Sequence, residues 1–456
     1  MRTANGDVGP EELRQAVESD FATIQAGLER LVAIPSVSAA GHDPSQVRRC
    51  AEAARDWLLD AGLREARLLE VPGAHPAVFG QTPGPPGSPT VLLYAHHDVQ
   101  PAGLEELWDS PAFTAAKRDG RLYGRGTADD KAGIAAHVAA LRAWRGEPPV
   151  TVSVFLEGEE EIGSPHLDAF LDLHGDLLEA DAYVLADCSN WSLGTPALTT
   201  SLRGILDFTV EVKTLDHAVH SGVYGGPVPD ALIVLCRLIA SLHQPNGDVA
   251  VSGLRTGPSF DDVISEDHVR RFTGLQPDIP LLGSGTMADR LWSHPAIAVV
   301  AIDAPPVAEA ANKLVPVARA KVSVRLAPGD DAESAEAAIR AHLNDQLTWG
   351  ATVTVTTMYD GAPHLIDTSG RAFEAFRKAC AQTWGCAPVE AGSGGSLPIV
   401  AALAQAFPGA PLLLTGVADP DSLAHSENES VHLAELEKCC LNEAILLGEL
   451  AGPGQL

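Results

Sequence analysis

Apolar residues recur at three- and four-residue spacing over residues 11–33 and 45–61. This spacing places them on one face and predicts two amphipathic helices. Two apolar runs follow, within PTVLLYA (89–95) and VTVSVFL (150–156), and such runs are typical of strands buried on both faces. A helical pattern, KAGIAAHVAALRAW (131–144), separates them. The alternation of strand and helix indicates an α/β sheet covered by helices.

From about residue 200 the pattern changes. The segments GILDFTVEVKTL (204–215) and ARAKVSVRLAP (318–328) alternate apolar and polar residues, which predicts strands with one face in water. Two further segments have helical spacing, PDALIVLCRLIASLH (229–243) and DAESAEAAIRAHLNDQL (331–347). Strands with one wet face and helices beside them suggest a small α+β domain.

After residue 363 the first pattern returns. A predicted helix (RAFEAFRKACAQTWG), a strand (PLLLTGV) and a final helix (VHLAELEKCCLNEAILLGELA) complete the chain. We therefore expect a discontinuous α/β domain, formed by residues 1–199 and 363–456, around an inserted α+β domain at residues 200–362.

Composition excludes several classes of protein. Hydrophobic residues make up 45% of the 456 residues and charged residues 20%, which is typical of a globular chain. The formal charge of −29 argues against nucleic acid or an anionic membrane as a partner. No long apolar segment suggests a membrane span, and the N-terminus has no apolar core of a signal peptide. Seven scattered cysteines do not suggest a disulfide framework, so we expect a cytoplasmic protein.

Carboxylates and histidines recur at the ends of the predicted core strands. They are His96 and Asp98 in YAHHDVQP, Asp129 and Asp130 in GTADDKAG, the three glutamates of LEGEEEIGS, Asp187 in VLADCSN and His425 in AHSENES. Each group alone has an ordinary explanation, as a strand-end histidine, a helix cap or a solvated loop. Together they lie where open α/β sheets place their sites. Five such ligands suit two zinc-like ions if one carboxylate bridges them.

The three adjacent glutamates, Glu159, Glu160 and Glu161, need a separate explanation, because neighbouring like charges repel one another. A cation bound nearby would explain why three glutamates are adjacent, because it would offset their repulsion. One glutamate could bind the metal, and an unligated one could accept a proton from water.

The chain contains seven motifs in a definite order: YAHHDVQP, LYGRGTADDKAG, LEGEEEIGS, HSGVYGG, NKLVPVARAKVSVRLAP, GGSLP and AHSEN. This series resembles the M20 family of metallopeptidases, and within it the dipeptidase branch related to carnosinase. The resemblance implies a metallo-aminopeptidase-like catalytic α/β sandwich with an inserted lid and dimerisation domain. It also implies five metal ligands, in which Asp129 bridges two ions, His96 and Asp187 complete one site, and Glu161 and His425 complete the other.

The resemblance further implies the roles of residues around the metals. Glu160 would be the general base, Asp98 would orient His96, and Glu159 is expected to be solvated. His220 would reach the active site of a partner subunit and polarise the carbonyl of the bond to be cleaved.

A separate set of residues is implied for the terminal carboxylate of the substrate. Arg325 would bind it, since a guanidinium can donate two parallel hydrogen bonds. Asn312 and the backbone around Gly394, Gly395 and Ser396 would contribute further contacts.

We therefore predict a homodimeric metallopeptidase with two divalent ions per subunit, which hydrolyses dipeptides or short peptides with a free C-terminal carboxylate. Zinc is the expected metal, and manganese and cobalt accept the same ligands. Two alternatives remain open: hydrolysis of N-acyl or N-carbamoyl amino acids, and a metal-free binding homologue that has lost catalysis.

Overall fold

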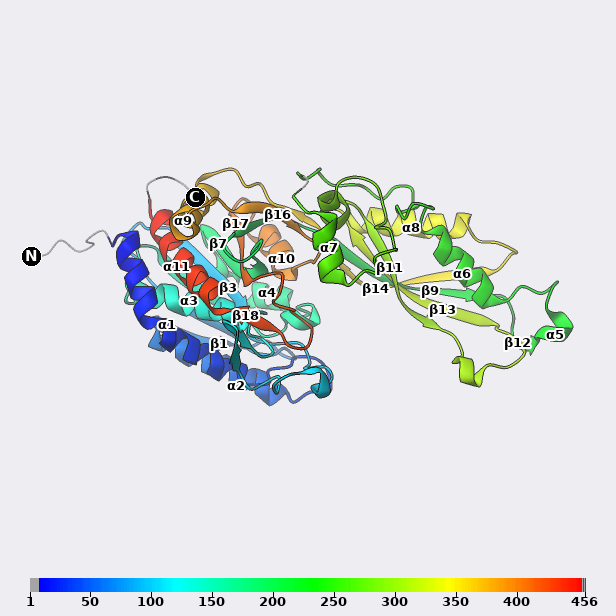
Figure 1. The fold of residues 1–456 in the computed structure, drawn as a ribbon, viewed down its shortest axis with the longest axis horizontal. Coiled ribbons are helices and arrows are strands. Elements are labelled where there is room, and N and C mark those ends of the chain that lie inside the picture. The colour runs from blue at the N-terminus through cyan, green and yellow to red at the C-terminus, as the bar shows by residue number, and fades with distance from the viewer. Residues whose placement is uncertain (1–7, 262, 453, 455) are drawn as a thin grey trace, which may run out of the picture. The chain divides into compact units, whose positions relative to one another are not determined.

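The computed structural model describes residues 8–261, 263–452, 454 and 456. Residues 1–7, the start of the expected catalytic domain, lie outside this description. The chain forms two compact units (Figure 1). The first contains the chain up to Thr200, residues 366–391 and residues 397–456, and the second contains residues 201–365 and 392–396. The predicted two-domain α/β architecture, with a second domain inserted into the first, is confirmed.

A central mixed sheet organises the first unit, with the strand order β1-β2-β6-β3-β7-β17-β8. Its strands are β1 (Glu65–Leu69), β2 (Ala77–Thr82), β3 (Thr90–His96), β6 (Thr151–Glu157), β7 (Ala182–Ser189), β8 (Ala197–Leu202) and β17 (Leu412–Ala418). The four central strands β6, β3, β7 and β17 run parallel. Their carboxyl ends therefore lie along one edge of the sheet, which is the edge that carries the predicted ligands.

Helices surround this sheet. They are α1 (Pro10–Val32), α2 (Pro44–Asp60), α3 (Lys131–Ala143), α4 (Leu167–Leu178), α9 (Arg371–Trp384), α10 (Pro398–Ala406) and α11 (Leu433–Leu450). The helices α1, α3 and α11 pack against one another, and α3 and α11 also contact the central strands. Almost every residue of β3 and β6 is buried, as expected for strands covered on both faces.

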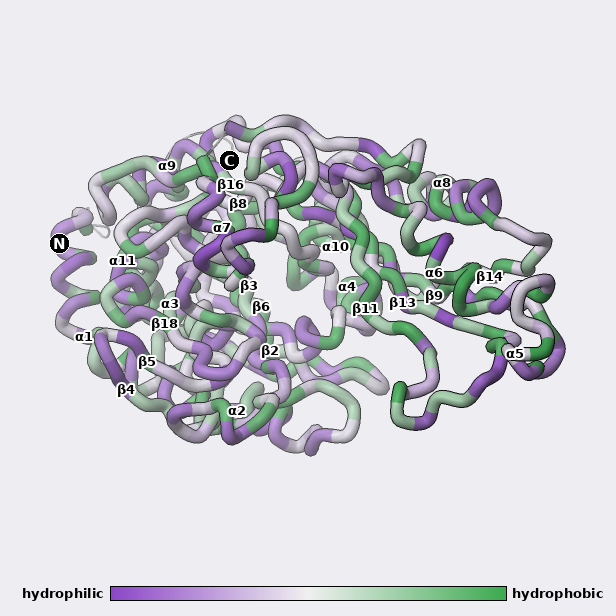
Figure 2. Tube along the Cα trace, turned by 45° about the vertical axis from the view of Figure 1, so that its right-hand side comes forward, coloured by the Kyte–Doolittle hydropathy of each residue, from purple (hydrophilic) through white to green (hydrophobic). Residues whose placement is uncertain are grey.

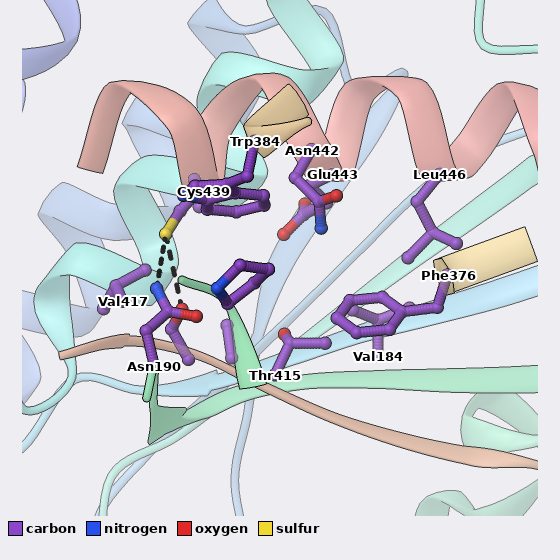
Figure 3. Close-up of a pocket in the computed structure, with 14 residues that line it drawn as sticks. Val184, Asn190, Phe376, Trp384, Thr415, Val417, Cys439, Asn442, Glu443 and Leu446 are labelled. Carbon is purple, nitrogen blue, oxygen red and sulfur yellow. Dashed lines mark hydrogen bonds between the residues drawn. The ribbon is translucent and has the colours of Figure 1, made fainter. Parts of the chain in front are cut away.

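The packing of α11 and α9 over β7 and β17 encloses a cavity of about 20 Å³ (Figure 3). At its edge, Asn190 Nδ2 donates to Cys439 Sγ at 3.4 Å, and Cys439 Sγ donates to the Gly416 carbonyl at 3.3 Å. Cys439 is therefore held by hydrogen bonds, and all seven cysteines of the chain are free. The cavity is about the size of one water molecule, so it is a small packing defect rather than a ligand site.

Short elements complete the first unit. The strands β4 (Ala116–Arg118), β5 (Arg121–Tyr123) and β18 (Ser430–His432) form a small antiparallel sheet. The 3-10 turns η1 (Glu105–Leu107) and η2 (Glu160–Ile162) lie in loops after β3 and β6. The pairing of β5 with β18 brings the loop before α3 close to the loop that contains His425.

The second unit contains a four-stranded antiparallel sheet with the order β11-β13-β9-β14. Its strands are β9 (Gly204–Lys213), β11 (Ala296–Asp303), β13 (Val317–Leu326) and β14 (Thr352–Gly361). Alternate residues of β9 and β13 are buried against α6 (Ala231–Ser241) and α8 (Ala332–Asp345), which confirms the predicted strands with one wet face.

Smaller elements of the second unit are β10 (Val219–His220), β12 (Lys313–Leu314), α5 (Ser221–Tyr224), α7 (Glu266–Thr273), the π-helical turn η3 (Asp289–Ser293) and the 3-10 turn η4 (Val307–Glu309). The strands β15 (His364–Leu365) and β16 (Val389–Ser393) pair with β8, along which the chain leaves the first unit. Among the described residues, no helix has the length and apolar character needed to cross a membrane.

Candidate metal centre

The five predicted ligands lie together at the carboxyl edge of the central sheet and form two groups that share Asp129. One group is His96, Asp129 and Asp187, and the other is Asp129, Glu161 and His425. The two oxygens of Asp129 face different histidines, since Oδ1 lies 2.9 Å from His96 Nε2 and Oδ2 lies 3.0 Å from His425 Nε2. Asp129 therefore lies between the two histidines and belongs to both groups.

The ring of His96 is fully buried and held in one orientation. Its Nδ1 lies 3.1 Å from the Asp98 carbonyl and 3.4 Å from Asp98 Oδ1, so Nε2 is directed at Asp129. Asp98 Oδ2 also accepts hydrogen bonds from Ser38 Oγ at 2.7 Å and from the Glu161 N–H at 3.1 Å. One buried carboxylate thus connects a ligand of the first group to the backbone of a ligand of the second. Partners of this kind fix the tautomer and position of metal-binding histidines.

His97, the neighbour of His96, faces the other way, as the alternation of a strand requires. Its Nε2 lies 2.9 Å from the Pro76 carbonyl. Burial lowers the pKa of His97 to about 4, so the ring is neutral and belongs to the core.

Glu161 is held by Gln100, a residue for which the sequence predicts no role. The Gln100 N–H donates to Glu161 Oε1 at 3.0 Å, and Gln100 Nε2 donates to Oε2 at 2.8 Å and to the Glu161 carbonyl at 3.1 Å. Glu161 Oε2 also lies 3.1 Å from His425 Nε2. Gln100 is part of the YAHHDVQP motif. Its position two residues after Asp98 is the feature of the sequence that could have indicated its role.

His425 lies in the loop after β17 with φ of 64°, in the left-handed region that a residue with a side chain rarely adopts. Such strain persists where the surroundings hold the residue, and it often occurs at functional sites.

The nearby Glu429 is fully buried and accepts four hydrogen bonds from the loop that contains Asp129. Glu429, like Gln100, has no role predicted from the sequence. It is part of the AHSENES motif and links the loop that contains His425 to the loop that contains Asp129.

The donor set fits divalent cations. Asp187 Oδ2 is buried and has no hydrogen-bond partner among the described residues. Burial raises the pKa of Asp187, and the adjacent charges of Asp130 and Asp129 raise it further. The pKa of Glu160 is raised by burial and then by Asp187. A cation among these oxygens would offset both the burial and the repulsion, and carboxylate and imidazole ligands of this kind suit zinc and related ions.

Glu159 corrects one prediction from the sequence, because it is buried and not solvated. Its Oε1 accepts a hydrogen bond from the His75 N–H at 2.8 Å, and its Oε2 lies 2.8 Å from His166 Nδ1. These two partners stabilise the charge of the buried Glu159 carboxylate, which the local sequence alone predicts to be exposed to water. The three adjacent glutamates thus have three different environments.

Known proteins resemble this chain in sequence and in fold. Residues 92–442 match the sequence profile of Peptidase family M20/M25/M40. The chain belongs to this family. It is 34% identical over 367 residues to the cysteinylglycine-S-conjugate dipeptidase of Corynebacterium striatum, an alignment that covers 79% of this chain and 81% of the relative. It is 28% identical to the Cys-Gly metallodipeptidase dug1 of Schizosaccharomyces pombe, over 93% of this chain and 94% of that protein.

Two solved structures of dipeptidases have the same fold. The dipeptidase Dug1p from Saccharomyces cerevisiae superposes with a TM-score of 0.83 at 24% identity, over 98% of this chain and 99% of that chain. Human carnosine dipeptidase 1 superposes with a TM-score of 0.81 at 24% identity, over 97% and 98% of the two chains.

The remaining predicted residues of this M20 chain lie in the second unit. His220 is exposed at the start of α5, and its Nδ1 accepts a hydrogen bond from the Gly222 N–H at 3.0 Å, which leaves Nε2 as the protonated nitrogen of the neutral ring. Arg325 is half-buried on β13, and Asn312 is exposed. Residues 394–396 follow β16 in a loop.

Proposed function

We propose that the protein is a metal-dependent dipeptidase that hydrolyses short peptides with a free C-terminal carboxylate. The observation that carries this proposal is the sharing of Asp129 by two groups of ligands, with Glu160 next to the ligand Glu161. Membership of the M20 family and the dipeptidase names of the relatives support the substrate class. They do not favour the alternative of an N-acyl or N-carbamoyl amino acid hydrolase.

His96, Asp129 and Asp187 would hold one divalent ion, and Asp129, Glu161 and His425 would hold the other. Zinc is the metal we propose, because two imidazoles and three carboxylates are ligands that zinc commonly takes. When bound, the ions would lower the pKa of a water molecule and polarise the peptide carbonyl.

Glu160 is the proposed general base. Its carboxylate accepts a proton from the attacking water as the new C–O bond forms, and it delivers this proton to the amine nitrogen as the C–N bond breaks. Positioned proton transfer of this kind contributes roughly 10²- to 10⁴-fold to the rate. Asp98 acts through His96, whose ring it holds.

The substrate contacts would come from the second unit. Arg325, Asn312 and the backbone of residues 394–396 bind the terminal carboxylate in this proposal. His220 of the partner subunit would polarise the carbonyl of the bond to be cleaved, through a hydrogen bond from its Nε2–H to the carbonyl oxygen.

We also propose that the protein is a homodimer that assembles through the second unit. Strand β11 lies at one end of the four-stranded sheet, and its side chains Val299, Val300 and Ile302 are exposed. The strand is visibly hydrophobic in Figure 2. An exposed apolar edge strand readily pairs with a second chain.

A cytoplasmic location is proposed from the seven free cysteines.

The function is tested by measuring hydrolysis of a dipeptide panel by the metal-loaded protein, with N-acetyl and N-carbamoyl amino acids as the competing substrates. Glu160→Gln should lower kcat by at least about 10²-fold while the metal content stays at the wild-type value. Glu147→Gln, which changes an exposed glutamate of the same unit, serves as the control. Full activity of Glu160→Gln, or faster cleavage of the N-acyl compounds, would refute the proposal.

A further inference from the structure

Arg203 has an unusual environment in the second unit, between the end of β8 and the start of β9. Its Nη1 donates to the His294 carbonyl over a long 3.4 Å, and its Nε is buried with no hydrogen-bond partner among the described residues. A guanidinium has five N–H donors, and the described residues provide a hydrogen-bond acceptor for only one of them, at Nη1.

The charge of Arg203 is also unmatched. No carboxylate among the described side chains forms an ion pair with Arg203 or with Arg325, although the chain has 60 acidic residues against 31 Lys and Arg. Burial, and then the neighbouring charge of Arg325, lower the pKa of Arg203 to about 10. Strand β13 pairs with β9 so that Arg325 lies opposite Ile205, two residues after Arg203. Two like charges thus lie near each other without a carboxylate partner among the described side chains, which is unfavourable unless an anion binds there.

The glycine loop after β16 lies directly against this guanidinium. Arg203 Nη2 is 3.0 Å from the position that a Cβ on Gly394 would occupy. The Arg203 N–H donates to the Ser393 carbonyl at 3.1 Å, and the Gly395 N–H donates to Ser393 Oγ at 3.2 Å. Arg203 thus anchors the loop through its backbone while its side chain borders the loop at Gly394.

We infer that Arg203 and Arg325 together bind the terminal carboxylate of the peptide substrate, an inference that rests on the proposed dipeptidase function. A carboxylate has two oxygens that accept several hydrogen bonds, and a planar guanidinium donates to them in pairs. The bound carboxylate supplies the counter-ion that both arginines lack. A peptide with a C-terminal amide leaves the two charges unmatched, so Arg203 determines specificity for free peptides.

The test compares a dipeptide with its C-terminal amide as substrates of the metal-loaded full chain. Arg203→Met should raise KM for the free dipeptide by about 10- to 100-fold, the scale of a lost charged hydrogen bond, with a much smaller change in kcat. Cleavage of the amide should be unaffected, and Arg203→Lys should recover part of the loss. Arg237→Met, which removes an exposed arginine of the same unit, is the control and should match the wild type.

A binding measurement separates this inference from the proposed function. Calorimetry with a phosphinic dipeptide analogue, bearing either a carboxylate or an amide at its C-terminus, requires no turnover. If the wild type fails to hydrolyse dipeptides, the proposed function is wrong, and the loss of carboxylate preference in Arg203→Met still supports the role of Arg203. Equal losses for the acid and the amide, an unchanged preference in Arg203→Met, or a wild type without preference would each overturn the inference.

Discussion

Replacing Glu429 with glutamine is expected to loosen the loop that carries Asp129. In the native chain, Glu429 Oε2 accepts hydrogen bonds from Arg125 Nη1 at 2.7 Å and from the Gly126 N–H at 3.0 Å. Its Oε1 accepts from the Ala128 N–H at 2.9 Å and from the Asp129 N–H at 3.1 Å. Both Glu429 and Arg125 are buried, so no water replaces a lost partner.

The size of the effect follows from these four contacts. A glutamine has one acceptor oxygen, so its NH₂ group must face two of the four donors. Glutamine is neutral, so the buried ion pair with Arg125 is lost in either orientation, which costs roughly 3–5 kcal/mol. If the NH₂ group faces the N–H groups of Ala128 and Asp129, these two buried donors also lose their acceptor, and if it faces Arg125 and Gly126, those donors do. Either arrangement destabilises the first unit by about 3–5 kcal/mol.

Two measurements check this expectation. Thermal denaturation of the metal-loaded chain should show a midpoint lowered by about 6–20 °C, given that 1 kcal/mol shifts a domain of this order of size by about 2–4 °C. Metal affinity, measured by competition with a chelator, should fall by about 10- to 100-fold, the usual effect of removing a partner of a ligand.

The matched control is Glu427→Gln, a change of the same type two residues away. Within the described part of the chain, Glu427 accepts a single long hydrogen bond, from the Leu104 N–H at 3.4 Å, so we expect a change within about 0.5 kcal/mol. If Glu429→Gln has the same midpoint and metal affinity as Glu427→Gln, the four contacts do not position Asp129 and the reasoning is wrong.

Three further predictions follow from other contacts. Removal of divalent ions with a chelator should abolish activity and lower the denaturation midpoint, because Asp129, Asp187 and Glu161 then repel one another. A midpoint that did not change, or that failed to recover when zinc was added, would contradict the ligand assignment. Glu159→Gln should cost about 1–2 kcal/mol in unfolding measurements, because the contact with His166 loses its charge. Burial lowers the pKa of His364, so the folded chain binds fewer protons than the unfolded chain as the pH falls through about 6.5. Stability should therefore decrease with acidification over this range, and His364→Gln should make the denaturation midpoint less dependent on pH.

The sequence was sufficient to predict the elements and the edge of the sheet that carries the site. The predicted helix at residues 11–33 is α1, Pro10–Val32, and the apolar run before His96 is β3. These predictions hold because burial of one helix face, or of both faces of a strand, leaves a periodic pattern in the chain itself. The type and order of the candidate ligands were equally visible, since they follow the ends of the core strands.

The environment of individual side chains could not be predicted in the same way. Glu159 was expected in water, but it is buried with His166 and with the backbone of His75, which is 84 residues away in the sequence. Glu429 meets its four donors some 300 residues earlier in the chain. No local pattern encodes such partners, because a buried carboxylate is stabilised only by the donors that folding brings to it.

The sequence by itself therefore determined which residues could bind cations and on which edge of the sheet they lie. Only the tertiary structure decided that the two oxygens of Asp129 face two different histidines, and that Arg203 has no carboxylate partner among the described residues. The physical reason is that periodicity records the burial of a segment, whereas hydrogen bonds and charge pairs depend on distances of about 3 Å between segments that are remote in the chain.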